Sequence, residues 1–313
     1  MNNVRSTPRE KDWKPRYVLM TAAHNEEKFL EHTIESVCMQ TVTPKRWVVV
    51  SDNSSDRTAE IVAGYARKHE FIRLVEIRRH RGRSFAAKAR ALQNCAEQFA
   101  DIEFDFIGNL DADMTLPAHY YSYLLDYFEK NSRVGLVSGF ICEERGGKFR
   151  SRSSNRIDSV PHAAQLVRRE CYEEIGGYSV LPYGGEDWYA QTRARMSGWQ
   201  AESLPQLPAY HHRATGGGSS AIVHRFRLGK LDYSFGSDPV FEIFKCMQRL
   251  HEAPAVLGAM ARLAGFLCSC LQREERPVPK EFVNYLRSEQ KRKVNFLLRH
   301  GRPINATAAG TEV

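Results

Sequence analysis

The sequence lacks several patterns that define common protein classes. It has no run of about 18 uncharged apolar residues, so we expect no transmembrane helix, and the polar stretch from Met1 to Lys14 has no apolar signal-peptide core. Its seven cysteines include no Cys-x-x-Cys pair, which disfavours a zinc or disulfide framework and predicts reduced thiols in the cytoplasm. Neither a Gly-x-Gly-x-x-Gly run after the first predicted strand nor a Gly-Lys-Ser/Thr loop occurs, which disfavours dinucleotide oxidoreductases and ordinary ATPases.

The sequence carries more positive than negative charge, and the excess is unevenly distributed along the chain. The net charge is +8, and the segment from Gly216 to Val313 holds 15 Lys and Arg against 9 Asp and Glu. A basic C-terminal third predicts a polyanionic neighbour, which can be an anionic membrane surface, a phosphorylated substrate or nucleic acid. Because no nucleic-acid-binding motif accompanies the basic residues, we expect a membrane or phosphate contact and no nucleic-acid partner.

Four apolar segments in the first 110 residues have the composition of strands, and amphipathic segments of helical period lie between them. The strands are predicted at 17–22, 47–50, 71–77 and 104–110. In the first helix, Leu30, Thr33, Ile34 and Val37 share one face. This alternation predicts an α/β fold with a mostly parallel, Rossmann-like sheet and helices on both faces.

The fourth predicted strand runs into Asp111-Ala112-Asp113 and then Pro117. Ligands of open α/β sheets bind outside the carboxyl ends of the strands, and carboxylates there suit a hard cation. The alternation of strand side chains predicts that Asp111 and Asp113 point to the same side. An Asp-x-Asp pair also occurs as a simple loop or helix cap, so the other segments have to decide its role.

Those segments resemble the family 2 glycosyltransferases of GT-A fold. The resemblance rests on motifs in the family's order: Ala23-His24-Asn25-Glu26-Glu27, Ser51 to Thr58, Asp111-Ala112-Asp113, Gly176-Gly177-Tyr178 with Gly185-Glu186-Asp187, and the helix from Arg193 to Gly198. It covers about residues 16 to 215. It implies a GT-A domain over 16–215, after a polar lead-in at 1–15 and before a basic helical region at 216–300 and a disordered tail at 301–313.

The resemblance also implies how a nucleotide-diphosphate sugar is held. Asp113 is assigned to a divalent cation, Mn²⁺ or Mg²⁺, and Asp111 to the ribose or to the same cation. Lys88 is assigned to the nucleotide or its phosphates, although a solvated helix face is an equal alternative. The other donor-binding positions fall on Ala23, Asn25, Glu26, Asp52 and Ala112.

On the acceptor side, the resemblance makes Asp187 the general base and Glu186 a neighbour that orients or binds the acceptor. A carboxylate accepts the hydroxyl proton as attack proceeds, and partial desolvation raises its pKa toward a useful value. The family precedent is a single displacement with inversion at the anomeric carbon. The alternative role of Asp187 is to cap the helix that begins near Trp188.

Three further features lie at the end of the core domain and beyond it. Either His211 or His212 is a candidate cation ligand, because imidazole is a borderline donor. The stretch 213–220 has the glycine content of a mobile loop. Arg225 or Arg227 is a candidate for bidentate contact with the diphosphate.

Two apolar segments stand out in the basic C-terminal region. The segment 253–271 is predicted to be a helix that packs on the core, on a partner subunit or in a bilayer interface. The segment 281–299 places Phe282, Tyr285 and Leu286 beside basic residues, as in a lipid-binding or an ordinary surface helix.

The sequence therefore predicts a cytoplasmic, metal-dependent, inverting glycosyltransferase, peripheral at the membrane, that adds a sugar to a lipid-linked saccharide in surface polysaccharide biosynthesis. Two alternatives stay open. One is a sugar-nucleotide nucleotidyltransferase, which should have a Gly-rich basic loop after the first strand. The other is a noncatalytic membrane-associated scaffold on the same fold.

Overall fold

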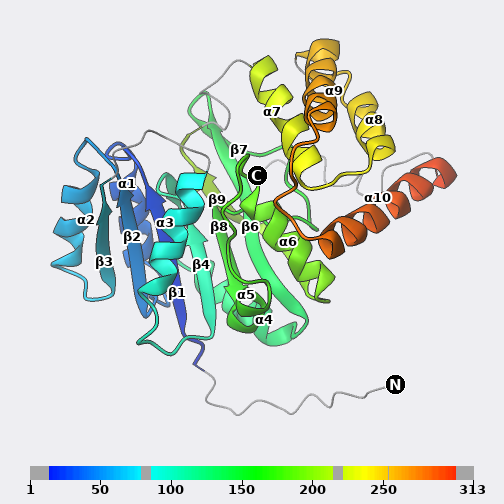
Figure 1. The fold of residues 1–313 in the computed structure, drawn as a ribbon. Coiled ribbons are helices and arrows are strands. Elements are labelled where there is room, and N and C mark those ends of the chain that lie inside the picture. Colours follow the sequence, from blue (N-terminus) through cyan, green and yellow to red (C-terminus); the bar gives the residue numbers. More distant parts are fainter. Residues whose placement is uncertain (1–13, 79–85, 214–220, 253, 301–313) are drawn as a thin grey trace.

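The computed structural model describes residues 14–78, 86–213, 221–252 and 254–300, and they form one mixed α/β layer structure (Figure 1). Its nine strands belong to a single sheet in which β7 pairs only with β6 and the others follow the order β3-β2-β1-β4-β8-β6-β9-β5. The strands are β1 (Tyr17–Ala23), β2 (Arg46–Asp52), β3 (Ile72–Ile77), β4 (Phe106–Leu110), β5 (Met114–Thr115), β6 (Val134–Arg145), β7 (Lys148–Ser151), β8 (Ala164–Arg168) and β9 (Gln200–His211).

The direction of the strands confirms the predicted mostly parallel sheet and adds a mixed half. β1 pairs in parallel with β2 and with β4, and β2 pairs in parallel with β3. β8 then runs antiparallel between β4 and β6, while β9 is again parallel to β6. The polar loops at the carboxyl ends of β1, β2 and β4 therefore share one edge of the sheet.

Helices cover both faces of this sheet because alternate strand residues are apolar on both sides. On one face Tyr17 and Leu19 of β1 pack with α1 (Leu30–Cys38), α2 (Thr58–Ala66) and α4 (Tyr120–Lys130). On the other face Val18 and Met20 pack with α3 (Ala86–Glu97), α5 (Arg169–Glu174) and α6 (Glu186–Met196). The predicted inner face of α1 is confirmed, since Leu30, Thr33, Ile34 and Val37 are buried.

The short strand β5 brings the Asp-x-Asp segment next to the far half of the sheet. Met114 pairs with His211 and Thr115 pairs with Tyr210, both antiparallel, and the His212 amide donates to the Asp113 carbonyl oxygen at 3.0 Å. This pairing places the end of β9 beside the end of β4, although the two segments are about 100 residues apart in sequence.

Four helices follow β9: α7 (Ala221–Ser234), α8 (Pro239–Gln248), α9 (Ala255–Leu271) and α10 (Lys280–His300). α8 begins at a capped end, because the Asp238 carboxylate accepts from the Val240 amide at 2.9 Å and Pro239 occupies the first turn. None of the helices described is long and apolar enough to cross a membrane. Figure 1 shows α7, α8 and α9 as a group at the upper right.

The helix α10 attaches to the core rather than presenting its apolar stripe outward. Phe282 is 1% exposed and Leu286 is 2% exposed, and they share a cluster with Tyr189 of α6 and with Phe235. The interpretation of this stripe as a lipid contact is therefore wrong for Phe282 and Leu286, because both cover α6. The predicted loop from Ala214 to Ser220, the predicted domain boundary within it, and the predicted tail 301–313 lie outside the described residues.

Candidate active site

Asp111 lies just beyond β4 and forms the centre of one half of the site. Its Oδ1 accepts from the Lys88 Nζ of α3 at 2.7 Å and from the Asn109 side chain at 3.1 Å. Burial alone would raise the pKa of Asp111, but the charge of Lys88, helped by both hydrogen bonds, outweighs it and lowers the pKa to about 2. Lys88 is thus a partner of the Asp-x-Asp segment and does not lie on a purely solvated helix face.

Asp113 forms the other half of this acidic centre, with side chains from the end of β9 around it. The His211 Nε2 lies 3.2 Å from its Oδ1, and the Arg213 Nε lies 3.5 Å from its Oδ2. His211 Nδ1 is buried without a hydrogen-bond partner among the described residues. A carboxylate and an imidazole that converge in this way suit Mn²⁺ or Mg²⁺. No third His, Cys, Asp or Glu of the described residues completes a ready-made cage, so substrate phosphates would have to fill the remaining positions.

Glu26, in the turn between β1 and α1, lies next to this centre and forms an ion pair with the guanidinium of Arg213. Burial is the main cause that raises the pKa of Glu26 to about 7, and the charges of Asp113 and Asp111 add to it while Arg213 opposes it. Glu26 is therefore a carboxyl group that can be protonated near neutral pH.

This shift predicts how the stability depends on pH. Because the pKa of Glu26 is raised from 4.5 to about 7 on folding, its contribution is full below pH 4.5 and is lost as the pH rises through 7. We expect Glu26→Gln to remove this loss, which is at most about 3 kcal/mol for a shift of this size. Thermal unfolding of both proteins across this pH range measures it. Glu60→Gln, at an exposed site on α2, should follow the wild-type curve, and an unchanged pH dependence in Glu26→Gln would contradict the assignment.

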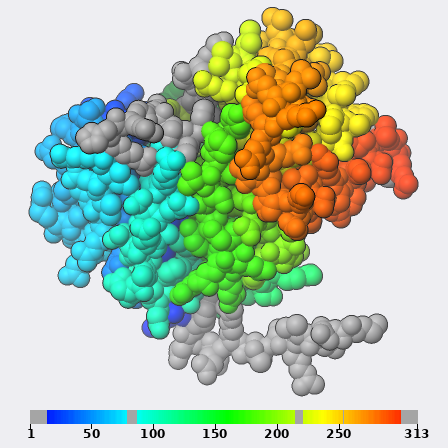
Figure 2. All heavy atoms as spheres, in the orientation of Figure 1, coloured from blue at the N-terminus to red at the C-terminus, as the bar shows by residue number. Residues whose placement is uncertain are grey.

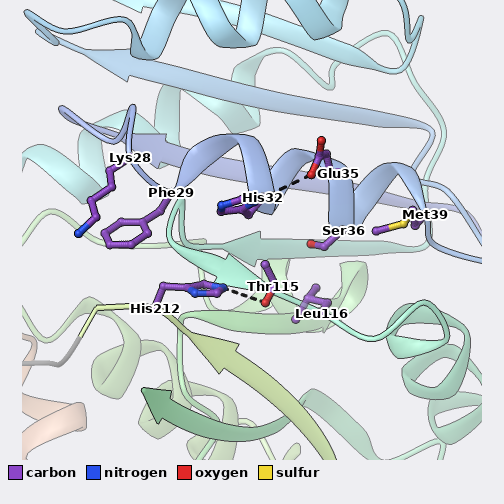
Figure 3. Close-up of a pocket in the computed structure, with 9 residues that line it drawn as sticks. All are labelled: Lys28, Phe29, His32, Glu35, Ser36, Met39, Thr115, Leu116 and His212. Atoms are coloured by element: carbon purple, nitrogen blue, oxygen red, sulfur yellow. Dashed lines mark hydrogen bonds and ion pairs between the residues drawn. The ribbon is translucent and has the colours of Figure 1, made fainter. Parts of the chain in front are cut away.

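The neighbouring His212 turns to a different part of the molecule. Its Nε2 lies 2.9 Å from the Thr115 hydroxyl, and its ring stacks near Phe29 at 6.0 Å between centroids. It lines a pocket of about 500 Å³. Figure 3 shows it there with His32 of α1 and with Met39, directly after α1. Of the two predicted candidates, it is therefore His211 whose imidazole meets Asp113.

The loops after β1 and β2 are tied to each other at the same edge. The Asn25 side-chain oxygen accepts from the Ser55 amide at 2.8 Å, and the Glu26 amide donates to the Thr58 hydroxyl at 2.8 Å. Asp52 is buried at the end of β2, where its carbonyl oxygen lies 2.7 Å from His24 Nδ1. Asn25 thus holds the shape of this edge, and Ala23 and Ala112 are buried backbone positions beside it.

Glu186 and Asp187 open α6, directly after Gly185. Gly185 has φ 81°, and a Cβ there would lie 3.0 Å from the Phe235 ring, so only glycine fits this close contact without strain. The Asp187 Oδ1 accepts from the Trp188 amide at 2.7 Å within the first turn of α6, and the N-cap residue of this helix is Gly185, so Asp187 is not its N-cap. Burial, reinforced by the charge of Asp187, raises the pKa of Glu186 against the opposing charge of Lys88.

Lys88 interacts with carboxylates from both the predicted donor side and the predicted acceptor side of the site. The charges of Asp111, Glu186 and Asp187 all raise its pKa, against a burial effect that lowers it. Asp111 comes from the end of β4, and the other two carboxylates come from the start of α6. The structure therefore brings the predicted donor-side and acceptor-side carboxylates around one lysine.

Two residues of this centre were missed by the sequence analysis. Arg213 pairs with Asp113 and Glu26, and its only signal in the sequence is its position directly after the histidine pair. His162 is 5% exposed, its Nδ1 lies 3.9 Å from Glu186, and burial lowers its pKa to about 3. A single histidine before a strand carries no signal of such a position.

The two predicted diphosphate-binding arginines lie on α7, outside this group of contacts. The Arg225 Nη2 donates to Glu252 at 2.9 Å, in the loop before α9. Arg227 is exposed two residues further along the same helix. The structure thus places Arg213, rather than either of these residues, against the acidic centre.

Comparisons with known proteins agree with this geometry. Residues 19–182 match the family described as Glycosyl transferase family 2, which is more than half of the 313 residues. The chain belongs to this family of sugar-transferring enzymes. A curated relative, poly-beta-1,6-N-acetyl-D-glucosamine synthase of Staphylococcus epidermidis, is 28% identical over 147 residues. That alignment covers 46% of this chain and 32% of the relative, so the chain spans about a third of the length of the curated relatives it matches.

Solved structures resemble the chain over nearly its whole length. A mannosyltransferase of Pyrobaculum calidifontis in complex with GDP-Man and Mn²⁺ has a TM-score of 0.54 at 17% identity, over 93% of this chain and 82% of that one. S. aureus TarS 1–349 in complex with UDP-GlcNAc has a TM-score of 0.52 at 15% identity, over 92% of each chain. The fold is that of the GT-A glycosyltransferases, with added C-terminal helices.

Proposed function

We propose that this protein is an inverting glycosyltransferase that moves a sugar from a nucleotide-diphosphate sugar to a hydroxyl of a saccharide acceptor. The observation that carries the proposal is the convergence of Asp111, Asp113, Glu186 and Asp187 around Lys88, His211 and Arg213, inside a family 2 domain. Transfer needs a site that holds a diphosphate and removes a proton on the opposite side. This group of residues supplies both.

In this proposal the donor lies across the carboxyl ends of β1, β2 and β4. Asp52 and the loop held by Asn25 contact the nucleoside, and Asp113 with His211 holds Mn²⁺ or Mg²⁺. When bound, the cation neutralises the diphosphate that leaves. Arg213 and Lys88 are two cations near the same region, and each already balances a carboxylate there. Two proteins of similar fold were solved with a nucleotide sugar, and one of them also holds Mn²⁺. These structures support the proposed arrangement.

The acceptor hydroxyl is activated at the start of α6. Asp187 accepts its proton, and Glu186 binds or orients the acceptor beside it. A base must lie within hydrogen-bond reach of the proton it removes, and it must be ionised when it does so. Burial is the main cause that raises the pKa of Glu186, and this shift favours the binding or orienting role for Glu186.

The pathway follows from the relatives. The curated relatives make a poly-N-acetylglucosamine, so we place the reaction in surface polysaccharide biosynthesis, with a lipid-linked saccharide as acceptor. All seven cysteines are free thiols, which supports a reducing, cytoplasmic location at the inner face of the membrane. The protein has no role with nucleic acid in this proposal.

A panel of uridine, guanosine and thymidine diphosphate sugars tests the function. With Mn²⁺ or Mg²⁺ present, we expect one donor to release its nucleoside diphosphate, slowly alone and faster with a saccharide acceptor. Chelation of the metal should stop the release. A noncatalytic scaffold would show no release with any donor, and a nucleotidyltransferase would release pyrophosphate from a nucleoside triphosphate and a sugar phosphate instead.

A further inference from the structure

The helices α8 and α9 turn all of their charged side chains inward. α8 has only Glu242 and Lys245, and α9 has only Arg262. Arg262 Nε donates to Glu242 Oε1 at 2.9 Å and its Nη2 pairs with Asp232 of α7, while Lys245 Nζ lies 2.7 Å from Asp232 Oδ1. These four side chains form a single ion cluster between α7, α8 and α9, with side-chain exposures from 0% to 22%.

The outer faces of the same two helices are apolar. Their large apolar side chains repeat at helical spacing and are between 48% and 84% exposed: Val240, Ile243 and Met247 on α8, and Val256, Leu257, Met260, Leu267 and Leu271 on α9. We call these eight residues the outer apolar face. Figures 1 and 2 show α8 and α9 at the upper right of the molecule, where both reach the surface.

This arrangement is the reverse of what water favours. A surface helix in water buries its apolar stripe and exposes its charges, because burying ions costs free energy even when they are paired. Helices in contact with lipid instead direct charges to the interior of their bundle and apolar side chains outward. The α7–α9 group follows the pattern of helices in contact with lipid, because its charged side chains lie inside and its apolar side chains lie outside.

The contact between α7 and α9 also resembles the packing of helices in membranes. A Cβ added at Gly229 would lie 1.9 Å from the Arg262 carbonyl oxygen, and one at Gly265 would lie 2.0 Å from the Phe226 carbonyl oxygen. The two backbones therefore touch at a pair of glycines, as helices do where close backbone packing, rather than burial of large side chains, holds them together. Five large apolar side chains of α9 are thus left on the outside, while Phe266 is buried against Tyr233 of α7.

We propose that the outer apolar face of α8 and α9 seats in the interface of a lipid bilayer with anionic headgroups. α9 has 17 residues and is about 25 Å long, which is shorter than the hydrocarbon core of about 30 Å, so the helix lies along the interface. Arg273, exposed two residues after α9, meets the headgroups. A protein partner is disfavoured because the eight side chains offer no hydrogen-bonding group to set a register with it.

Membrane binding through the outer apolar face would hold the candidate active site at the membrane. Leu231 and Phe235, at and just after the end of α7, pack against Gly185, directly before Glu186 and Asp187. α9 packs on α7, so the seated helices are connected to the start of α6 through α7. Membrane binding itself does not depend on the proposed transfer reaction, since it is measured without donor or acceptor.

Co-sedimentation of the full chain with vesicles tests the proposal. We expect the wild-type protein to bind vesicles of mixed phosphatidylglycerol and phosphatidylcholine, and the double variant Leu257→Glu with Met260→Glu to bind at least tenfold less. Both side chains are 61% exposed, so the changes should leave the thermal unfolding temperature close to that of the wild type. The matched control is Leu298→Glu on α10, where the side chain is 68% exposed outside the outer apolar face; it should bind like the wild type.

Three results would overturn the proposal. The first is a wild-type protein that stays in solution with these vesicles, and the second is equal binding by the double variant. The third is sedimentation velocity that shows a dimer in the wild type and a monomer in the double variant, without vesicle binding, because the face would then be covered by a second copy. Fluorescence of Met260→Trp adds a direct measure: lipids with brominated acyl chains should quench it if the face enters the bilayer.

Discussion

Replacing Asp113 by Asn is expected to lower kcat/KM for sugar transfer by about 10³-fold, as is typical when a group that stabilises the charge of a leaving group is removed. The change keeps the shape of the side chain and removes its charge from between His211 and Arg213. An amide is a poor ligand for a divalent cation compared with a carboxylate, so Mn²⁺ should no longer strengthen the binding of the nucleoside diphosphate. Steady-state kinetics and calorimetric titration of the diphosphate, with and without Mn²⁺, measure the two effects.

The control for this variant is Asp126→Asn, at an exposed position on α4. It removes the same charge far from the acidic centre and should leave both measurements unchanged. If Asp113→Asn keeps the wild-type rate and the wild-type response to Mn²⁺, then Asp113 does not hold the cation, and the proposed use of the Asp-x-Asp segment is wrong.

The second large effect is expected for Asp187→Asn, with a loss in kcat of about 10³-fold, within the range for removal of a general base. The KM for the donor should change little, because the donor lies at the strand ends. The asparagine oxygen can still accept from the Trp188 amide, which Asp187 Oδ1 now does at 2.7 Å. This hydrogen bond in the first turn of α6 is therefore preserved, and a loss of rate cannot be attributed to a lost helix.

Glu186→Gln is the companion of that variant. It lies on the same turn of α6 and also removes one carboxylate near Lys88, so it tests whether charge alone matters. We expect its kcat to fall by about tenfold, the size of a lost orienting contact rather than a lost base. If Glu186→Gln is the more damaging of the two changes, the two roles are exchanged.

Much of the first half of the fold could be predicted from local patterns. The strands 17–22 and 104–110 are short apolar runs that end in polar residues, and the inner face of α1 follows from the spacing of Leu30, Ile34 and Val37. Side-chain period and strand ends are local properties, so a single sequence reports them. The mixed half of the sheet was not predicted, because β5 has two residues and β8 has five, and their partners lie far away in the chain.

The carboxylates of the candidate site and Lys88 were predictable from the sequence, whereas Arg213 and His162 were not. Asp111 and Asp113 follow a strand, and the motif containing Asp187 opens a helix, so their place at an edge could be inferred from the chain. Arg213 and His162 reach that edge only because β9 and β8 return to it from elsewhere in the sheet. A charged partner that is distant in sequence leaves no mark on the pattern around it.

The amino-acid sequence was sufficient for the class of fold, for the family and for the acidic residues at the edge of the sheet, since each depends on short patterns. Only folding decided that His211 meets Asp113 while His212 turns to Thr115, because neighbouring side chains at a strand end point in different directions. Folding also decided that α10 buries its stripe on α6 and that α8 and α9 keep theirs outside. An amphipathic helix has an apolar face by virtue of its sequence, but what that face covers depends on the elements packed around it.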